Sequence, residues 1–353
     1  MSGILSCPVP LPTVPPYAVH RLCDRFPVVA RERLIAELVP PPRFARERFS
    51  TFRPDPQQPT QAAAVERLER FALDLAAPAP TGRWFRRSAS LEGRPGRYLD
   101  GGFGVGKTHL LASLWHEAPH PKSFATFVAM TDLVGALGFA ATVDALSGHR
   151  LLCIDEFELD DPGDTVLMST LLGRLVDAGV RLAATSNTLP DALGEGRFAA
   201  DDFVREIQGL ASSFEVVRVD GEDYRHRGLP SAPPPVDAAE VRDRAARTAG
   251  STLDDFRGLL GHLTQVHPSR YGALLDGVAG VFLTDVRTVD DQAAALRLVA
   301  LVDRLYDRAV PVVAGGVALD SVFAPELLRG GYRKKYFRAM SRLVALAREG
   351  GTG

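Results

Sequence analysis

The chain has 353 residues with 41 basic and 43 acidic side chains, so its net charge is −2, and 46% of its residues are hydrophobic. This length predicts about two domains with a large core, and the balanced charge gives no general attraction to nucleic acid or to anionic membranes. Three cysteines without metal-ligand spacing argue against a disulfide framework. The sequence shows neither a signal peptide nor the roughly 18 uninterrupted apolar residues of a membrane span. We therefore expect a cytoplasmic protein whose membrane contact is peripheral at most.

Residues 1–80 form the first predicted section, an N-terminal extension that is rich in proline. Two helices are predicted in it, at residues 31–39 and 60–71, and the prolines that begin at Pro40 end the first of them. The section closes at Pro78 and Pro80.

Residues 81–227 alternate strand and helix signals, which predicts a parallel sheet with flanking helices. The strand candidates are short apolar runs that contain β-branched residues, as buried parallel strands usually do. They are Arg97–Asp100, Phe124–Val128, Leu151–Ile154, Arg181–Thr185 and Phe214–Val219.

A phosphate-binding loop follows the first strand candidate and precedes a predicted helix. Its sequence fits G-x-x-x-x-G-K-[ST], in which bare backbone N–H groups at a helix N-terminus hold the phosphates of a nucleotide. We expect Lys107 to reach the β- and γ-phosphates and the hydroxyl of Thr108 to bind Mg²⁺. The predicted nucleotide-binding residues are Gly101, Gly102, Phe103, Gly104, Val105, Gly106, Lys107 and Thr108.

Two acids follow the third strand candidate, at the edge of a parallel sheet where ligands bind. We expect Asp155 to contact Mg²⁺ and Glu156 to orient and polarise the attacking water. Asn187 follows the next strand candidate and can hold the same water. The simpler interpretations are two ordinary acids at a strand end and a Ser-Asn turn.

These residues lie in motifs that resemble the ZapE/Afg-type ATPases, a phosphate-loop family related to AAA+ proteins. The resemblance rests on the acids followed by Phe157, on the strand that ends in Asn187, and on segments along most of the chain. The segments are residues 52–56, 59–61, 155–157, 160–161, 184–191, 223–225, 301–307 and 337–343.

The resemblance implies an α/β fold of the P-loop NTPase (AAA+/ASCE-like) type that binds ATP and Mg²⁺ and hydrolyses ATP. In bacteria the family is associated with cell division and with destabilisation of FtsZ polymers, and in mitochondria with quality control of membrane proteins. The expected partner is therefore a protein substrate, either FtsZ or another division protein. The chain is expected to form homo-oligomers and to bind no nucleic acid.

An arginine that reaches the nucleotide of a neighbouring subunit is also implied by the resemblance. The family usually carries it in a Gly-Leu-Gln-Arg sequence, which this chain lacks at the corresponding place. Arg197 and Arg205 are therefore both candidates for stabilising charge on the transferring phosphoryl group. The alternative is that both are surface arginines on a helix.

Residues 228–237 read as a linker, and residues 238–353 form a C-terminal region of α/β type or a helical lid. Within it, residues 281–314 align with residues 151–184 at a constant separation of 130 residues. We predict a degenerate strand–helix–strand copy that extends the sheet or forms a lid, with Val286 at the position of Glu156. Val317 stands at the position of Asn187. The alternative is that any two such units align through their shared hydrophobic pattern.

Residues 329–346 predict a basic amphipathic helix. Its apolar positions recur at helical spacing. They are Phe337, Met340, Val344 and Ala347. Three interpretations remain open for its basic side: Arg338 contacts the nucleotide like a C-terminal sensor arginine, the helix docks on acidic protein or lipid, or the charges are simply solvated. The family resemblance favours the first.

The leading hypothesis is a Mg²⁺-dependent ATPase that remodels a protein partner. A small-molecule kinase also uses a phosphate loop, but it needs no acid such as Glu156 to activate water. Two competing hypotheses stay open, a DNA-linked ATPase of the helicase-loader type and a nucleotide-gated scaffold with little turnover.

Overall fold

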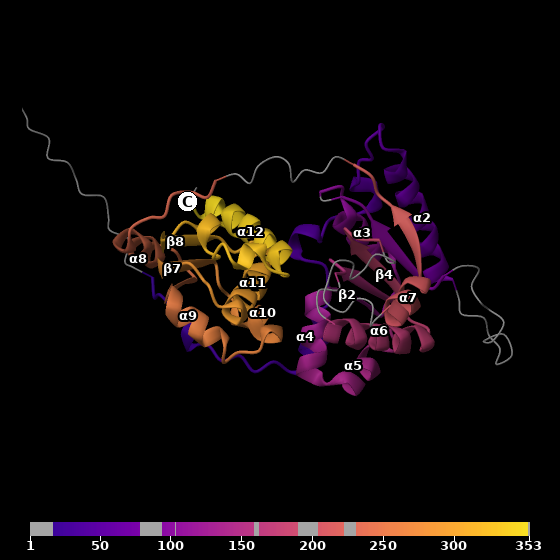
Figure 1. Ribbon diagram of the computed structural model, residues 1–353, viewed down its shortest axis with the longest axis horizontal. Helices are drawn as coiled ribbons and strands as arrows, with labels where there is room; N and C mark the ends of the chain where they lie inside the picture. The colour runs from indigo at the N-terminus through magenta and orange to yellow at the C-terminus, as the bar shows by residue number, and fades with distance from the viewer. Residues whose placement is uncertain are drawn as a thin grey trace, which may run out of the picture.

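The computed structural model describes residues 17–77, 94–102, 104–158, 162–189, 204–221 and 231–351. Figure 1 shows two helix-covered sheets side by side, one built from the purple and magenta part of the chain and one from the orange and yellow part. Among the described residues, no single helix is long and apolar enough to cross a membrane. The adjoining helices at residues 127–137 and 139–146 meet that criterion only as a pair, and they bend by 116° at their junction.

The first sheet has five parallel strands in the order β2-β3-β4-β1-β5. They are β1 (Gly96–Asp100), β2 (Lys122–Thr126), β3 (Leu151–Asp155), β4 (Arg181–Ser186) and β5 (Phe214–Arg218). All five predicted strands are confirmed. The prediction for residues 124–128 ran too far, because the side chain of Thr126 accepts a hydrogen bond from the backbone N–H of Ala129 and so begins the next helix.

Helices cover both faces of this sheet. They are α2 (Pro59–Ala76), α3 (Lys107–Glu117), α4 (Phe127–Leu137), α5 (Phe139–Leu146), α6 (Pro162–Asp177) and α7 (Val204–Ser212). Along β3, Leu152 and Ile154 pack with α4 and α6, whereas Leu151 and Cys153 pack with α2 and α3. Alternate residues are thus buried on opposite faces, as the continuous apolar run of this strand predicted. The expected buried position of Cys153 is confirmed.

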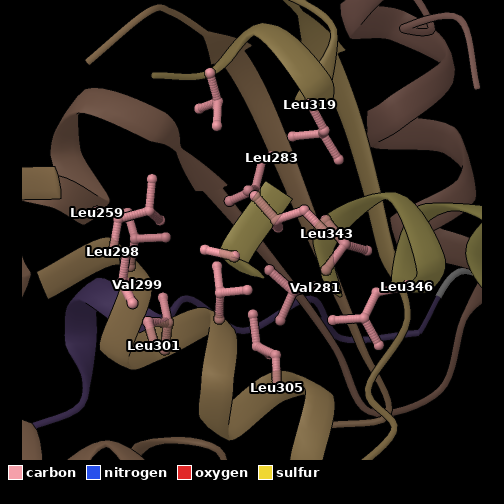
Figure 2. Packing of buried hydrophobic residues seen from close by; sticks show 14 of the residues in the cluster. Leu259, Val281, Leu283, Leu298, Val299, Leu301, Leu305, Leu319, Leu343 and Leu346 are labelled. Carbon is pink, nitrogen blue, oxygen red and sulfur yellow. The ribbon is translucent and has the colours of Figure 1, made fainter. Parts of the chain in front are cut away.

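The second sheet has three parallel strands in the order β6-β7-β8. They are β6 (Ser251–Asp255), β7 (Gly280–Val286) and β8 (Val312–Gly316). The surrounding helices are α8 (Ala238–Arg247), α9 (Phe256–Leu263), α10 (Tyr271–Leu274), α11 (Gln292–Asp307) and α12 (Arg333–Gly351). Leucine and valine side chains from α9, α11, α12 and the middle strand fill the core between them (Figure 2).

The predicted strand–helix–strand unit is present as β7, α11 and β8, but it lies in a sheet of its own and does not extend the first one. Helices α6 and α11 are separated by 130 residues at both ends. The sequence did not predict β6, which pairs with β7 as β2 pairs with β3. Since the copied strands correspond to β2, β3 and β4, the phosphate-loop strand β1 has no counterpart in the described part of the second unit.

One position of the copy needs a correction. Glu156 and Asp285 both have a φ of 54°, a left-handed conformation that is uncommon for residues other than glycine. Asp285, and not Val286, is therefore the backbone equivalent of Glu156. The pairing of β7 with β8 is irregular in the same place, between Leu283 and Val286.

The N-terminal segment joins the two units. Leu22 is fully buried in the core of the second unit, and its backbone N–H donates a hydrogen bond of 2.9 Å to the carboxylate of Asp254 at the end of β6. The short helix α1 (Arg31–Ala36) follows, and it ends three residues earlier than predicted. Leu38 lies just beyond its end. The carbonyl of Leu38 accepts a hydrogen bond of 2.8 Å from Phe124 in the edge strand β2.

Replacing Leu22 with alanine should therefore loosen the second unit selectively. A leucine-to-alanine change in a well-packed core costs about 3 kcal/mol. We expect faster amide hydrogen exchange in β6, β7 and β8 of Leu22→Ala, with little change in β1 to β4. Leu73→Ala is the matched control, since Leu73 is 71% exposed on α2. Unchanged exchange in the second sheet would contradict this assignment of the segment.

Candidate active site

The phosphate loop lies between β1 and α3, as predicted. Gly104 and Gly106 have φ values of 79° and 92°, and Gly106 immediately precedes the first turn of α3. Gly101 leaves no room for a side chain, because a Cβ there would lie 2.0 Å from the carbonyl oxygen of Val219. Glycine is therefore required here for backbone shape and for close approach. Phe103 lies outside the described residues.

Lys107 connects the loop to the tip of a neighbouring strand. Its ammonium group donates hydrogen bonds to the carbonyl oxygens of Gly101, at 2.8 Å, and Gly102. It also donates to Oδ1 of Asn187 at 2.9 Å. This contact arises because β4 pairs directly with β1, with Asp100 opposite Ser186. The predicted lysine and the predicted asparagine thus meet at the loop.

Asp155 lies buried at the tip of β3 and accepts two hydroxyl hydrogen bonds. One comes from Thr108, at 3.1 Å between the oxygens, and one from Thr185 in β4. Burial and the neighbouring charge of Glu156 raise the pKa of Asp155 to about 6, although the two hydroxyl groups act in the opposite direction. The guanidinium group of Arg342 also acts to lower this pKa, but the effect of burial is larger.

This pair of ligands fits Mg²⁺. Hydroxyl and carboxylate oxygens suit a hard cation, and a magnesium ion in a phosphate-loop protein takes its remaining ligands from phosphates and water. The part of the chain that the structure describes holds no group of three or more His, Cys, Asp or Glu side chains that could bind a metal by themselves. A magnesium ion at Thr108 and Asp155 would thus depend on the nucleotide.

Glu156 is held by its backbone next to this pair. Its N–H donates a hydrogen bond of 3.0 Å to the hydroxyl of Thr185, and the N–H of Phe157 donates to the carbonyl of the same threonine at 2.7 Å. Together with the left-handed φ of Glu156, these bonds fix where the chain leaves β3. Strained backbone of this kind is concentrated at functional sites.

The carboxylate of Glu156 forms ion pairs with two arginines of the second unit. Its oxygens lie 2.7 Å from Arg338 and 2.8 Å from Arg342, both on α12. The other nitrogens of these guanidinium groups bind Asp303 on α11, at 2.9 Å for Arg338. In Figure 1 these two helices lie on the side of the second unit that faces the first. The predicted water-activating residue thus binds the C-terminal helix.

This arrangement bears on the interpretations of the basic helix. The solvated-face interpretation is wrong for Arg338, which is four-fifths buried and lies at the acids beside the phosphate loop. Phe337, one of the apolar positions expected along one side of this helix, is 44% exposed, whereas Tyr336 is buried. Arg197 lies outside the described residues, and so does the side chain of Arg205, whose backbone is in α7.

Sequence reasoning missed Thr185, Asp303, Arg342 and Glu158. Arg342 stands one helical turn after Arg338, so its place on the same face of α12 could have been read from the spacing. Glu158 accepts a long hydrogen bond, 3.5 Å, from the amide nitrogen of Asn187. Thr185 and Asp303 lie in residues 184–191 and 301–307, two of the segments that resemble the family, and this resemblance could have pointed to them.

The raised pKa of Asp155 predicts a specific dependence of stability on pH. The folded protein binds this proton more tightly than the unfolded chain, so the free energy of unfolding should fall as the pH rises from about 4 to about 6. In the absence of nucleotide, Asp155→Asn should raise the free energy of unfolding by about 2 kcal/mol at about pH 7 and leave it unchanged at about pH 4. Chemical denaturation measures this.

Asp243→Asn is the matched control for this experiment, because Asp243 is exposed on α8 and should change the stability little at either pH. If Asp155→Asn were no more stable than the wild type at neutral pH, the pKa of Asp155 would not be raised in the folded protein.

The chain is similar to known proteins along most of its length. It matches the AFG1-like ATPase family over residues 28–240 and 231–350. It is 28% identical to the cell division protein ZapE of Escherichia coli (strain K12) over 347 residues, which cover 82% of this chain and 91% of that protein. It is also 30% identical to an uncharacterized protein of Schizosaccharomyces pombe over 157 residues, covering 39% and 35% of the two chains.

Among solved structures, the crystal structure of DnaI aligns with 52% of this chain and 98% of its own, at 19% identity and a TM-score of 0.39. The family match covers both units and nearly all of the chain outside its N-terminal segment. This chain therefore belongs to the AFG1-like ATPase family.

Proposed function

We propose that this chain hydrolyses ATP with Mg²⁺ and uses the reaction to remodel a protein partner in cell division. The observation that supports the chemistry most directly is the meeting of Lys107, Asn187, Thr108 and Asp155 at one loop. These contacts form only because β1, β3 and β4 end at the same edge of the sheet. A glycine-rich turn that bound no nucleotide would not require this arrangement.

Each residue has a role in this proposal. The loop N–H groups and Lys107 hold the phosphates, and Asn187 holds Lys107. Thr108 and Asp155 would hold Mg²⁺, which would supply positive charge against the phosphate groups. Glu156 orients the attacking water and accepts its proton. Buried hydroxyl contacts to Asp155 keep the metal ligand in place.

The partner is proposed from the relatives. The Escherichia coli protein is named a cell division protein, so we place this chain in the cytoplasm, acting on FtsZ polymers or on another division protein. ATP between subunits of a homo-oligomer would give Arg197 or Arg205 a role on the neighbouring nucleotide.

Glu156→Gln tests the hydrolytic part of the proposal. Glutamine keeps the size and the hydrogen-bonding oxygen but cannot accept the proton of water, so ATP turnover should fall about 100-fold or more while ATP binding is retained. Steady-state phosphate release and equilibrium binding measure the two quantities.

Lys107→Ala is the companion variant and should lose tight ATP binding, whereas Lys334→Ala should behave like the wild type because Lys334 is exposed on α12. Equal and negligible turnover in the wild type and in Glu156→Gln would instead favour a nucleotide-gated scaffold.

Co-sedimentation tests the partner. Glu156→Gln should stay bound to purified FtsZ polymers in the presence of ATP, because its nucleotide is not turned over, and Lys107→Ala should not. Turnover by the wild type should also rise with FtsZ. Stimulation by single-stranded DNA, with no response to FtsZ, would replace this partner with DNA and favour an ATPase of the helicase-loader type.

A further inference from the structure

Four charged side chains form one alternating cluster between the two units. Glu156 comes from the tip of β3, Asp303 from α11, and Arg338 and Arg342 from α12. Each arginine contacts both acids. The exposed fractions of the four side chains lie between 13% for Arg342 and 25% for Glu156. The cluster is therefore shielded from water and leaves each acid between two guanidinium groups.

The cluster is divided unequally between the units. Asp303 and both arginines belong to the second unit, so they keep one another if the units separate. Burial opposes the charge of Asp303, but the two guanidinium groups hold the pKa of this acid below its ordinary value. Glu156 is the member that the first unit contributes. Breaking a buried ion pair by removing one partner is costly, because the other charge is left uncompensated.

The position of the cluster indicates which other anion could replace Glu156 as the partner of the two arginines. Glu156 directly follows Asp155, which is hydrogen-bonded to Thr108 beside the phosphate-binding lysine. The γ-phosphate of ATP would therefore lie near the two arginines. A guanidinium group binds carboxylate and phosphate with the same two-pronged geometry, and the γ-phosphate offers more oxygens and more negative charge than a carboxylate.

We propose that Arg338 and Arg342 lock Glu156 away from catalysis and that the γ-phosphate of ATP unlocks it by taking over the two guanidinium groups. Asp303 is the positioning residue that holds both arginines in reach of either anion. The proposal rests on the proposed function for the role of Glu156. Because both arginines belong to α12, unlocking transfers the contact of the second unit from Glu156 to the nucleotide.

The same contact network reaches the N-terminal segment. The ring of Tyr306 on α11 lies 5.1 Å from the guanidinium carbon of Arg342 and 3.8 Å from that of Arg43. Arg43 also lies 3.8 Å from the carboxylate of Asp307. A shift of Arg342 would thus change the packing of Tyr306 and, through it, of Arg43 in the N-terminal segment between the units.

Equilibrium binding of Mg·AMPPNP and of Mg·ADP tests whether the γ-phosphate competes with Glu156 for the two arginines. Only AMPPNP carries a γ-phosphate, and a ligand shifts an equilibrium only by its differential affinity for the two states. Glu156→Gln removes the competing carboxylate, so the Kd for AMPPNP should fall about fivefold or more while the Kd for ADP stays the same. When Arg338 and Arg342 are both changed to glutamine, adding Glu156→Gln should no longer change the Kd for AMPPNP.

Two results would overturn the proposal. One is an unchanged Kd for AMPPNP in Glu156→Gln. The other is an equal gain with and without the two arginines, which would mean that Glu156 merely repels the γ-phosphate. Arg333→Gln, an exposed arginine on the same helix, is the matched control and should change neither Kd.

Two features keep the test decisive. If the double arginine variant loses its fold by circular dichroism, Arg342→Lys replaces it, because a single ammonium group cannot pair with both acids as a guanidinium does. In that variant the gain from Glu156→Gln should be smaller than in the wild type. AMPPNP is not hydrolysed, so the comparison measures the lock even if ATP turnover proves negligible, and the two failures can be told apart.

Discussion

The insertion of β4 between β1 and β3 is the constraint on which the active site depends. Parallel strands end at the same edge of a sheet, and the registers place Ser186 opposite Asp100 and Ala184 opposite Ile154. Thr185 near the end of β4 and Asn187, which follows this strand, can then contact groups from both sides. One binds Asp155 and the other binds Lys107. A different strand order would leave the phosphate loop and the two acids without a common neighbour.

The second consequence is electrostatic. Bringing Asp155 and Glu156 together at a buried strand tip concentrates negative charge, which raises the pKa of Asp155 and calls for cations. The fold supplies them from a distant part of the sequence, since α12 packs beside α11 and directs two arginines toward β3. The second unit thus completes the charge balance of a site to which it contributes neither the loop nor the metal ligands.

The features that depend on short stretches of sequence could be predicted. The phosphate loop, the strand before the acids and the strand before Asn187 follow from short patterns whose physical reasons are local, and all lie where expected. Three features depended on tertiary structure. β6 reads Ser-Thr-Leu-Asp-Asp, a polar sequence that resembles a loop. It is nevertheless largely buried, because it packs against α8 and α9. The pairing of Asp303 with Arg338 depends on how α11 and α12 dock. Tyr336 is buried and Phe337 is exposed, and the sequence of α12 alone does not specify which of two adjacent aromatic residues faces the core.

A structure of the full chain with Mg²⁺, ADP and beryllium fluoride would test the central claim most directly, because beryllium fluoride mimics the γ-phosphate. The account predicts that Arg338 and Arg342 lie within about 3 Å of its fluorine atoms, still bound to Asp303, and that the carboxylate of Glu156 faces the mimic. If both arginines still bind Glu156 while the mimic lies in the loop, the γ-phosphate does not release this residue.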